Sequence, residues 1–403
     1  MFSRKYHHLK NKEIYILIFL FLFSFLIRIP AIFILGDTSL ENEWKDIVNN
    51  LIEHKQFLYR DLPNLFMPPL YAFYLYFFST FGFGEQLYIS TILYSQILLS
   101  AISIIIFYKL NKNFFSEKIS FYSSILLSLF PLYIYACVQI SSITLQVFLI
   151  ILFFFYFFKF IKLKNFFSIF LLSIVCGLLI LLRGEFIIIF TFSIFYLFLF
   201  FKIKIKNILL IVLLTTITIS PYLVRNILMF DSFAITKSFG YNLWKGNNPN
   251  SLVEGSVVHN KDLEIKIKNV PQNKYYSSKI DKIYFDEALK NIMEEPKRYL
   301  ILFFKKFVSI LFIDFKSTYP NYYHPMHYLP LLLFGTTSLL GIALYDRKSH
   351  KLNYLILIFF LTVAIFSSFS ILPRYKLAIL PLQIIFTNIL ISYIYKKFFN
   401  RHE

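Results

Sequence analysis

The chain has 403 residues, of which 58% are hydrophobic, 21% aromatic and only 16% charged. In a soluble globular domain about a quarter of all residues are charged, so this composition excludes an ordinary soluble protein. The formal net charge of +19 does not indicate nucleic-acid binding, because most lysines lie in short links between long apolar runs. Lysines in such links set the direction of membrane spans.

The apolar runs recur along the whole length and approach the roughly 20 residues that one membrane span requires. They predict an all-α polytopic membrane protein with about ten transmembrane helices. With these spans the short basic links fall on one side, which predicts that both termini are cytoplasmic. The predicted spans are 14–35, 87–110, 119–135, 138–158, 166–182, 186–201, 208–223, 328–345, 352–372 and 377–395.

The first predicted span contains one charged residue after its start, Arg28. One interpretation is an arginine near the helix end that extends its charge to the interface or caps a carbonyl group. The other is a charge that faces inward, toward a functional site.

The first outer loop, residues 36–86, follows that span and contains the carboxylates Asp37, Glu41 and Glu43. An apolar piece inside it, residues 70–83, is about one third too short to span a membrane. We therefore expect an outer juxtamembrane helix there. A carboxylate in this loop can act as a general base toward a hydroxyl group.

The polar region 225–298 is the only stretch large enough for a small extramembrane domain, and with the segment up to residue 327 it forms one outer region. It begins with a turn-rich segment, and residues 299–313 form an apolar run that is interrupted by Lys305 and Lys306. These two lysines favour an amphipathic helix in the membrane interface over a span. The chain thus divides into an N-terminal transmembrane core (1–224), this outer region (225–327) and C-terminal transmembrane helices (328–403).

With this topology, the unusual polar residues gather at the outer face. Arg183, Arg225 and Arg374 are candidate phosphate-binding residues, because a guanidinium group can bind two phosphate oxygens at once. The aromatic and amide side chains of Tyr241, Trp244 and Asn247 are candidates for binding a sugar or an acceptor. No metal-ligand spacing is recognisable, and no cofactor is indicated, although a divalent metal ion is left open.

Several motifs resemble one family of membrane enzymes, the polytopic C-type glycosyltransferases. The likeness is to the family 39-like branch of protein mannosyltransferases and aminoarabinose transferases. It extends in order over nearly the whole chain. The motifs are LENEW…VNNL after the first span, MPPLYAFYLYFFSTFG, LLRGEF, PYLVRN followed by GYNLWKGNNPN, FDEALKNIMEEPKRYLILFFKK and LPRYKLAILP.

The resemblance implies transfer of a sugar from a polyprenyl-phosphate carrier to a glycan, lipid or protein acceptor outside the cytoplasm, usually with inversion. It implies a first-loop base, with Glu41 as the first candidate and Glu43 and Asp37 behind it. The candidate arginines would hold the lipid phosphate. Two departures leave the identity of the base open: Leu40 stands where the family has its first acid, and residues 139–143 contain no acid.

Two other functions would leave different signals in the sequence. A glycan polymerase or ligase of similar architecture would use a lipid-diphosphate donor. A transporter or flippase of lipid-linked glycans would place charged residues near the bilayer midplane and show internal repeats. Neither feature is evident in the sequence, which favours an enzyme of the inner (cell) membrane with its site on the outer face. Its partners would be membrane lipid, the carrier and the acceptor, and not nucleic acid.

Overall fold

The computed structural model describes residues 2–40, 42–81, 84–317 and 324–399. Within these ranges the fold is almost entirely helical, with one short antiparallel hairpin, β1 (Leu58–Tyr59) with β2 (Leu62–Pro63). The helices are α1 (Phe2–Leu35), α2 (Asn42–Glu53), α3 (Pro69–Ser79), α4 (Glu85–Asn111), α5 (Glu117–Leu129), α6 (Pro131–Cys137), α7 (Ile143–Leu163), α8 (Phe166–Leu182), α9 (Phe186–Leu199), α10 (Ile205–Phe230), α11 (Phe239–Gly246), α12 (Lys261–Lys268), α13 (Tyr276–Glu294), α14 (Pro296–Leu311), α15 (Pro325–Ala343), α16 (His350–Ser367), η2 (Pro373–Ala378) and α17 (Leu380–Phe399).

Six of the described helices are long and apolar enough to cross a membrane: α1, α4, α7, α10, α15 and α16. The bent pair α5 and α6 makes a seventh if it counts as one span. The chain is therefore a multi-pass membrane protein. Helices also occupy the other predicted spans, but α8 and α9 are shorter, with 17 and 14 residues. The number of ten spans accordingly stays a prediction.

The predicted span 119–135 is broken rather than straight. Helix α5 ends at Leu129, Phe130 adopts an extended conformation with ψ 114°, and α6 starts at Pro131. The axes of α5 and α6 differ by 58°. Proline removes a helix hydrogen bond and disfavours a helical conformation in the residue before it, so the break follows from Pro131.

Helix α7 lies at the centre of the bundle. Of the residues in its span, 72% are buried inside the protein, against 22% for α1. Its phenylalanines form part of the core, where the ring of Phe157 stacks on Tyr354 of α16 at 4.2 Å between centroids. The Tyr354 hydroxyl in turn lies 2.7 Å from the Ser193 hydroxyl of α9. The core thus joins α7, α9 and α16 and fixes the loops at their ends.

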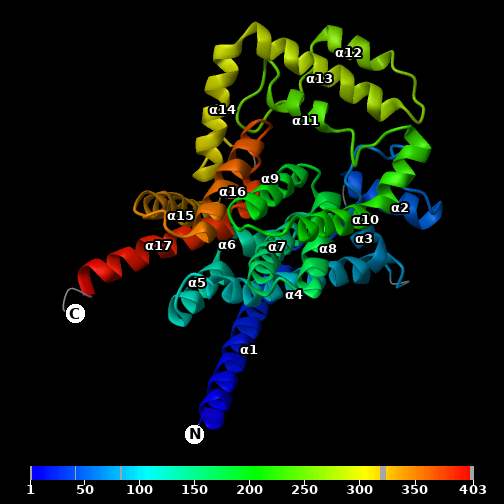
Figure 1. Ribbon diagram of the computed structural model, residues 1–403. Coiled ribbons are helices and arrows are strands. Elements are labelled where there is room, and N and C mark those ends of the chain that lie inside the picture. The colour runs from blue at the N-terminus through cyan, green and yellow to red at the C-terminus, as the bar shows by residue number, and fades with distance from the viewer. Residues whose placement is uncertain (1, 41, 82–83, 318–323, 400–403) are drawn as a thin grey trace.

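Helices α11, α12 and α13 form a small subdomain at the end of the molecule opposite the N-terminus of α1 (Figure 1). Its own core contains Trp244, Leu263, Tyr284 and Ala288. Helix α14 follows α13 closely: α13 ends at Glu294 and α14 starts at Pro296, with only Glu295 between them. We call α11–α13 the upper subdomain.

The first loop packs between the bundle and the upper subdomain. Helix α2 covers α3, with the Trp44 ring in edge-on contact with Tyr71 at 4.9 Å. The Phe66 ring contacts Tyr241 of α11 edge-on at 5.4 Å. The hairpin turn between β1 and β2 places Arg60 and Asp61 at φ values of 52° and 58°. Left-handed conformations are uncommon for residues other than glycine, and here they close a two-residue turn.

Candidate functional site

The turn of residues 138–142, between α6 and α7, is the structural centre of the candidate site. The Asp37 Oδ2 atom accepts a hydrogen bond of 2.6 Å from the Ile140 backbone N–H. The backbone N–H of Asp37 donates to the Val138 carbonyl oxygen at 3.1 Å. The Gln139 side chain donates to the Leu35 carbonyl oxygen at the end of α1. These bonds hold the start of the first loop against the 138–142 turn.

Arg183 reaches the same turn from the end of α8. Its Nη2 atom donates to the Ser142 hydroxyl at 3.3 Å. Its guanidinium carbon lies 5.4 Å from the centroid of the Tyr375 ring in η2. Asp37 and Arg183 therefore contact residues 140 and 142 of one turn, which brings a carboxylate and a guanidinium group together although they lie far apart in sequence.

Arg374 joins this group through the same tyrosine ring. Its guanidinium carbon lies 5.9 Å from the Tyr375 centroid, and the Tyr375 ring stacks on Phe366 of α16 at 5.4 Å. Two of the three predicted phosphate-binding arginines thus share one aromatic ring. Arginine stacks favourably on aromatic faces while its N–H groups stay available to ligands.

The other candidate carboxylates occupy different places. Glu43 lies in the first turn of α2 and is half-buried. Asp46, one turn later, accepts hydrogen bonds from the Arg60 backbone N–H at 2.7 Å and from the Asn50 amide at 3.2 Å, so it supports the hairpin. Glu41 lies outside the described residues.

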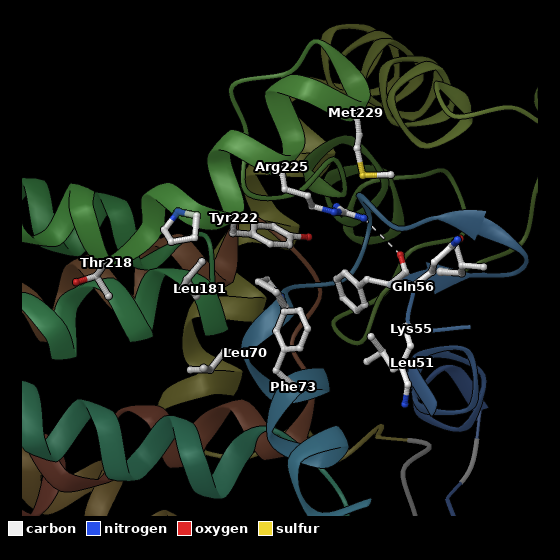
Figure 2. Close-up of a pocket in the computed structure, with 14 residues that line it drawn as sticks. Leu51, Lys55, Gln56, Leu70, Phe73, Leu181, Thr218, Tyr222, Arg225 and Met229 are labelled. Carbon is white, nitrogen blue, oxygen red and sulfur yellow. Dashed lines mark hydrogen bonds between the residues drawn. The ribbon is translucent and has the colours of Figure 1, made fainter. Parts of the chain in front are cut away.

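A cavity of about 670 Å³ lies between the first loop, α3, α8 and α10. Figure 2 shows its walls, with Leu51, Leu70 and Phe73 on one side and Tyr222 and Arg225 on the other. On α10 the lining extends from Thr218 to Met229, a length of about 16 Å at the usual helical rise. The walls are mainly apolar, with cationic side chains of Arg225 and Lys55 among them. Such a volume and lining fit one apolar chain with a polar end.

Arg225 connects the first loop to α10. Its Nη1 atom donates to the carbonyl oxygen of Asn64 at 2.7 Å, and its Nη2 atom to that of Phe57 at 3.4 Å (dashed line in Figure 2). The rings of Phe57, Tyr222 and Phe230 lie within 5.0–5.5 Å of its guanidinium carbon. A guanidinium group has five N–H donors, so these contacts occupy part of its capacity. Arg225 is not joined to the Tyr375 ring that Arg183 and Arg374 share.

The three candidate acceptor residues differ in exposure. Tyr241 is half-buried and faces Phe66 of the first loop. Trp244 is only 2% exposed and packs on Tyr241, Tyr284 and His259 inside the upper subdomain. Asn247 is buried at the end of α11, where its amide donates to the carbonyl oxygen of Ser368 at 2.9 Å.

Two buried lysines connect this region to α14. Lys306 is 0% exposed and donates to the carbonyl oxygen of Gly246 at 2.7 Å and to Asn247 Oδ1 at 3.2 Å. We expected it to face the membrane interface, and only its neighbour Lys305 is exposed. Lys376 of η2 is 1% exposed and donates to the Phe312 carbonyl oxygen at 2.8 Å and to that of Ser309.

Burial lowers the pKa values of both lysines. Burial lowers the pKa of Lys306 to about 7, since a charged ammonium group is disfavoured away from water. Burial also lowers the pKa of Lys376 to about 7, against the opposing effect of the nearby Asp314 charge. Each ammonium group compensates by donating to carbonyl oxygens near the end of a helix, where the helix dipole favours positive charge.

The site residues found only in the structure had weak signals in the sequence. The 138–142 turn is notable in sequence only for lacking an acid, yet it binds both Asp37 and Arg183. Tyr375 could have been suspected from its place beside Arg374. Among the described residues, no group of three or more His, Cys, Asp or Glu side chains could hold a metal ion.

The comparisons with known proteins identify the fold. No protein-family model and no curated protein matches the chain. Among solved structures, the apo oligosaccharyltransferase of Archaeoglobus fulgidus is similar at a TM-score of 0.54 and 12% sequence identity. The match covers 96% of this chain and 51% of the archaeal one. The chain has a C-type glycosyltransferase fold.

A second oligosaccharyltransferase structure from the same organism gives the same result. The oligosaccharyltransferase AglB from A. fulgidus in complex with an inhibitory peptide and a dolichol-phosphate has a TM-score of 0.52 and 14% identity, with 96% of this chain and 51% of AglB covered. The C-type glycosyltransferase fold of our chain therefore spans about half the length of AglB. A weaker likeness, to ArnT from Cupriavidus metallidurans bound to undecaprenyl phosphate, has a TM-score of 0.44 and 12% identity, and covers 94% of this chain and 77% of ArnT.

Proposed function

We propose that this chain is a membrane glycosyltransferase that moves a sugar from a polyprenyl-phosphate carrier to an acceptor hydroxyl on the outer face of the membrane. The observation that carries the proposal is the convergence of Asp37 and Arg183 on the 138–142 turn, with Arg374 joined to them through Tyr375. The site thus combines a carboxylate with two guanidinium groups, which are the charges that this reaction requires.

Asp37 is the base that the geometry favours. Its hydrogen bond from Ile140 fixes the orientation of the carboxylate beside the turn that Arg183 also contacts. The carboxylate takes the proton of the acceptor hydroxyl as its oxygen attacks the anomeric carbon. The bond from that carbon to the phosphate oxygen breaks, and lipid phosphate leaves with the electron pair. Attack opposite to the leaving group inverts the anomeric centre. Glu41 and Glu43 are the alternative bases.

The arginines stabilise the departing phosphate. Negative charge on the leaving oxygen grows in the transition state, and donors already in place stabilise it most. Arg183 and Arg374 are held by the ring of Tyr375, so their separation is set before the donor binds. We assign them to the leaving phosphate.

The cavity takes the first isoprenyl units of the carrier. Leu181 lines the cavity and Arg183 follows two residues later at the end of α8. Two residues extend at most about 7 Å, so this end of the cavity lies close to the backbone of Arg183. The Arg183 side chain itself contacts Ser142 and Tyr375 and would have to change its rotamer to meet a phosphate here. Arg225 supplies a further cation at the cavity wall. The dolichol-phosphate bound to AglB supports a carrier of this chemical class.

The acceptor approaches between the first loop and the upper subdomain. Tyr241 contacts Phe66 there. Of the three candidate acceptor-binding residues, it is the one whose ring lies between the first loop and the upper subdomain. Trp244 and Asn247 are buried, and we assign them to holding α11 in place below the acceptor. The topology that accompanies this proposal has ten spans, both termini in the cytoplasm and the site on the outer face of the inner membrane.

A transfer assay tests this function. The purified full chain in lipid nanodiscs is given labelled polyprenyl-phosphate sugars, with glycan, lipid and peptide acceptors in separate reactions. A parallel set contains polyprenyl-diphosphate glycans. We expect transfer from a monophosphate donor and a large loss in Arg183→Gln. Transfer from diphosphate donors alone would assign the chain to the ligase class, and no transfer by folded protein from any donor would contradict the proposal.

A further inference from the structure

Arg28 of α1 is completely buried inside the helix bundle. Its side chain is 0% exposed, so the charge does not extend to the membrane interface. The Nη1 atom donates to the Ser24 carbonyl oxygen at 2.9 Å and the Ser24 hydroxyl at 2.8 Å, with a longer bond of 3.4 Å to the Ser128 hydroxyl. The guanidinium carbon lies 5.3 Å from the centroid of the Tyr133 ring.

The remaining donors around this arginine have no acceptor. Arg28 Nε and Nη2 are buried and make no hydrogen bond within the described part of the chain, and the same holds for the hydroxyls of Ser100 and Tyr133. The Tyr133 hydroxyl faces the hydroxyls of Ser100 and Ser103, and the charge of Arg28 lies near Tyr133 and the Cys137 thiol. The two Arg28 groups can only donate, whereas the two hydroxyls can donate as well as accept, so donors outnumber acceptors in the cluster.

The cluster also has an excess of positive charge. Across the described ranges, no carboxylate lies within 4.0 Å of Arg28. Arginine stays protonated in proteins, so it cannot relieve its burial by losing the charge. A water molecule would satisfy the free N–H and O–H groups but would leave the charge uncompensated. An anion satisfies both, and a buried charge is tolerated best when it is paired.

We propose that Arg28, Ser100 and Tyr133 form an enclosed binding site for a small inorganic anion of the size of chloride, between α1, α4 and α6. Arg28 Nε and Nη2 and the two hydroxyls are its ligands. The buried residues Ala31, Ile97, Cys137 and Val138 pack together, and the Cys137 thiol lies near Arg28. The anion would bind there whether or not the chain transfers sugars.

An anion at this position would hold α1 against α4 and α6. The ends of α1 and α6 lead directly into the first loop and the 138–142 turn, which are joined by the bond from Gln139 to Leu35. Anion binding therefore stabilises the packing on which the position of Asp37 depends. Folding stability should therefore increase when a small inorganic anion such as chloride is present.

The test measures thermal unfolding of the purified full chain in detergent at constant ionic strength, with chloride replaced stepwise by gluconate, which is too large for an enclosed site. A ligand that binds only the folded state raises the unfolding temperature in a saturable way. We expect chloride and bromide to do so for the wild type. We expect Tyr133→Phe and Ser100→Ala, which each remove one donor hydroxyl, to need about tenfold more chloride for half of the effect.

Arg28→Met should abolish the chloride dependence, whereas Arg347→Met, at an exposed arginine, should retain it. If Arg28→Met does not fold, the two hydroxyl variants decide the question. Equal unfolding temperatures in chloride and gluconate for the wild type would overturn the proposal, because the cluster would then hold water alone. An identical chloride effect in wild type and the hydroxyl variants would also overturn it, because it would reveal a general salt effect.

Discussion

The Lys306 ammonium group donates a 2.7 Å hydrogen bond to the carbonyl oxygen of Gly246 and so joins α14 to the end of α11. Gly246 is required at this point, because a Cβ atom there would lie 2.5 Å from the backbone of Phe369. Phe369 precedes the turn that carries Arg374 by only a few residues. The upper subdomain, α14 and the segment that leads to Arg374 thus meet at Gly246.

The first prediction concerns this contact. Lys306→Met leaves the Gly246 carbonyl and the Asn247 side-chain oxygen without their donor, and a buried unpaired polar group costs about 1–3 kcal/mol. We expect the amides of α11 to exchange hydrogen at least about fivefold faster, as measured by mass spectrometry. Lys305→Met is the matched control, because Lys305 is exposed and adjacent. Equal protection in both variants would contradict the role of Lys306.

The second prediction concerns pH. Burial lowers the pKa of Lys306 from its usual 10.5 to about 7 in the folded protein. Between these two values the unfolded state binds more protons, so the free energy of unfolding rises with pH. Below pH 7 the lysine is protonated in both states and contributes no pH dependence.

The measurement is the free energy of unfolding of the wild type and of Lys306→Met. Both are unfolded in mixed micelles by increasing amounts of a denaturing detergent, at pH values from 6 to 9. The stability of the wild type relative to the variant should rise above pH 7, by at most about 1.4 kcal/mol per pH unit. A relative stability that stays constant or falls over this range would show that folding does not lower the pKa of Lys306.

The third prediction concerns the cavity. Met229 lines it and is 37% exposed, so Met229→Trp can be accommodated while it fills space beside Arg225. We expect the KM for the polyprenyl-phosphate donor to rise about tenfold with little change in kcat, which is the pattern for lost ground-state binding. Leu228→Trp is the control, because Leu228 is 76% exposed and does not line the cavity. Equal KM values in the two variants would place the carrier elsewhere.

Local sequence features predicted the helices well where their ends are marked by local chemistry. The span predicted at 166–182 coincides with α8, because Asn165 caps its start by accepting the Ser168 backbone N–H and the apolar run stops before Arg183. Helix α10, in contrast, continues past its predicted end at residue 223 and through Arg225. The contacts of that guanidinium group with Asn64 and three aromatic rings come from tertiary structure and leave no local signal.

The candidate site shows the same limit. Counting charges placed Asp37, Arg183 and Arg374 at one face, but it could not show that the first two meet on the 138–142 turn. That meeting depends on a backbone N–H of Ile140 and on the Ser142 hydroxyl, which are unremarkable groups in a sequence. The sequence likewise predicts Lys306 at the membrane interface. Its burial depends on a contact with the distant end of α11, which no local pattern reveals.

The fourth prediction tests the central claim, that Asp37 is the base of a sugar transfer from a polyprenyl-phosphate donor. The measurement is the single-turnover transfer rate of Asp37→Asn, with donor binding measured separately and Glu41→Gln and Glu43→Gln as parallel variants. Loss of a general base lowers the rate by about 10²–10⁴-fold, and we expect this loss in Asp37→Asn with donor affinity unchanged. A wild-type rate in Asp37→Asn, with the loss found in Glu41→Gln or Glu43→Gln instead, would contradict the account.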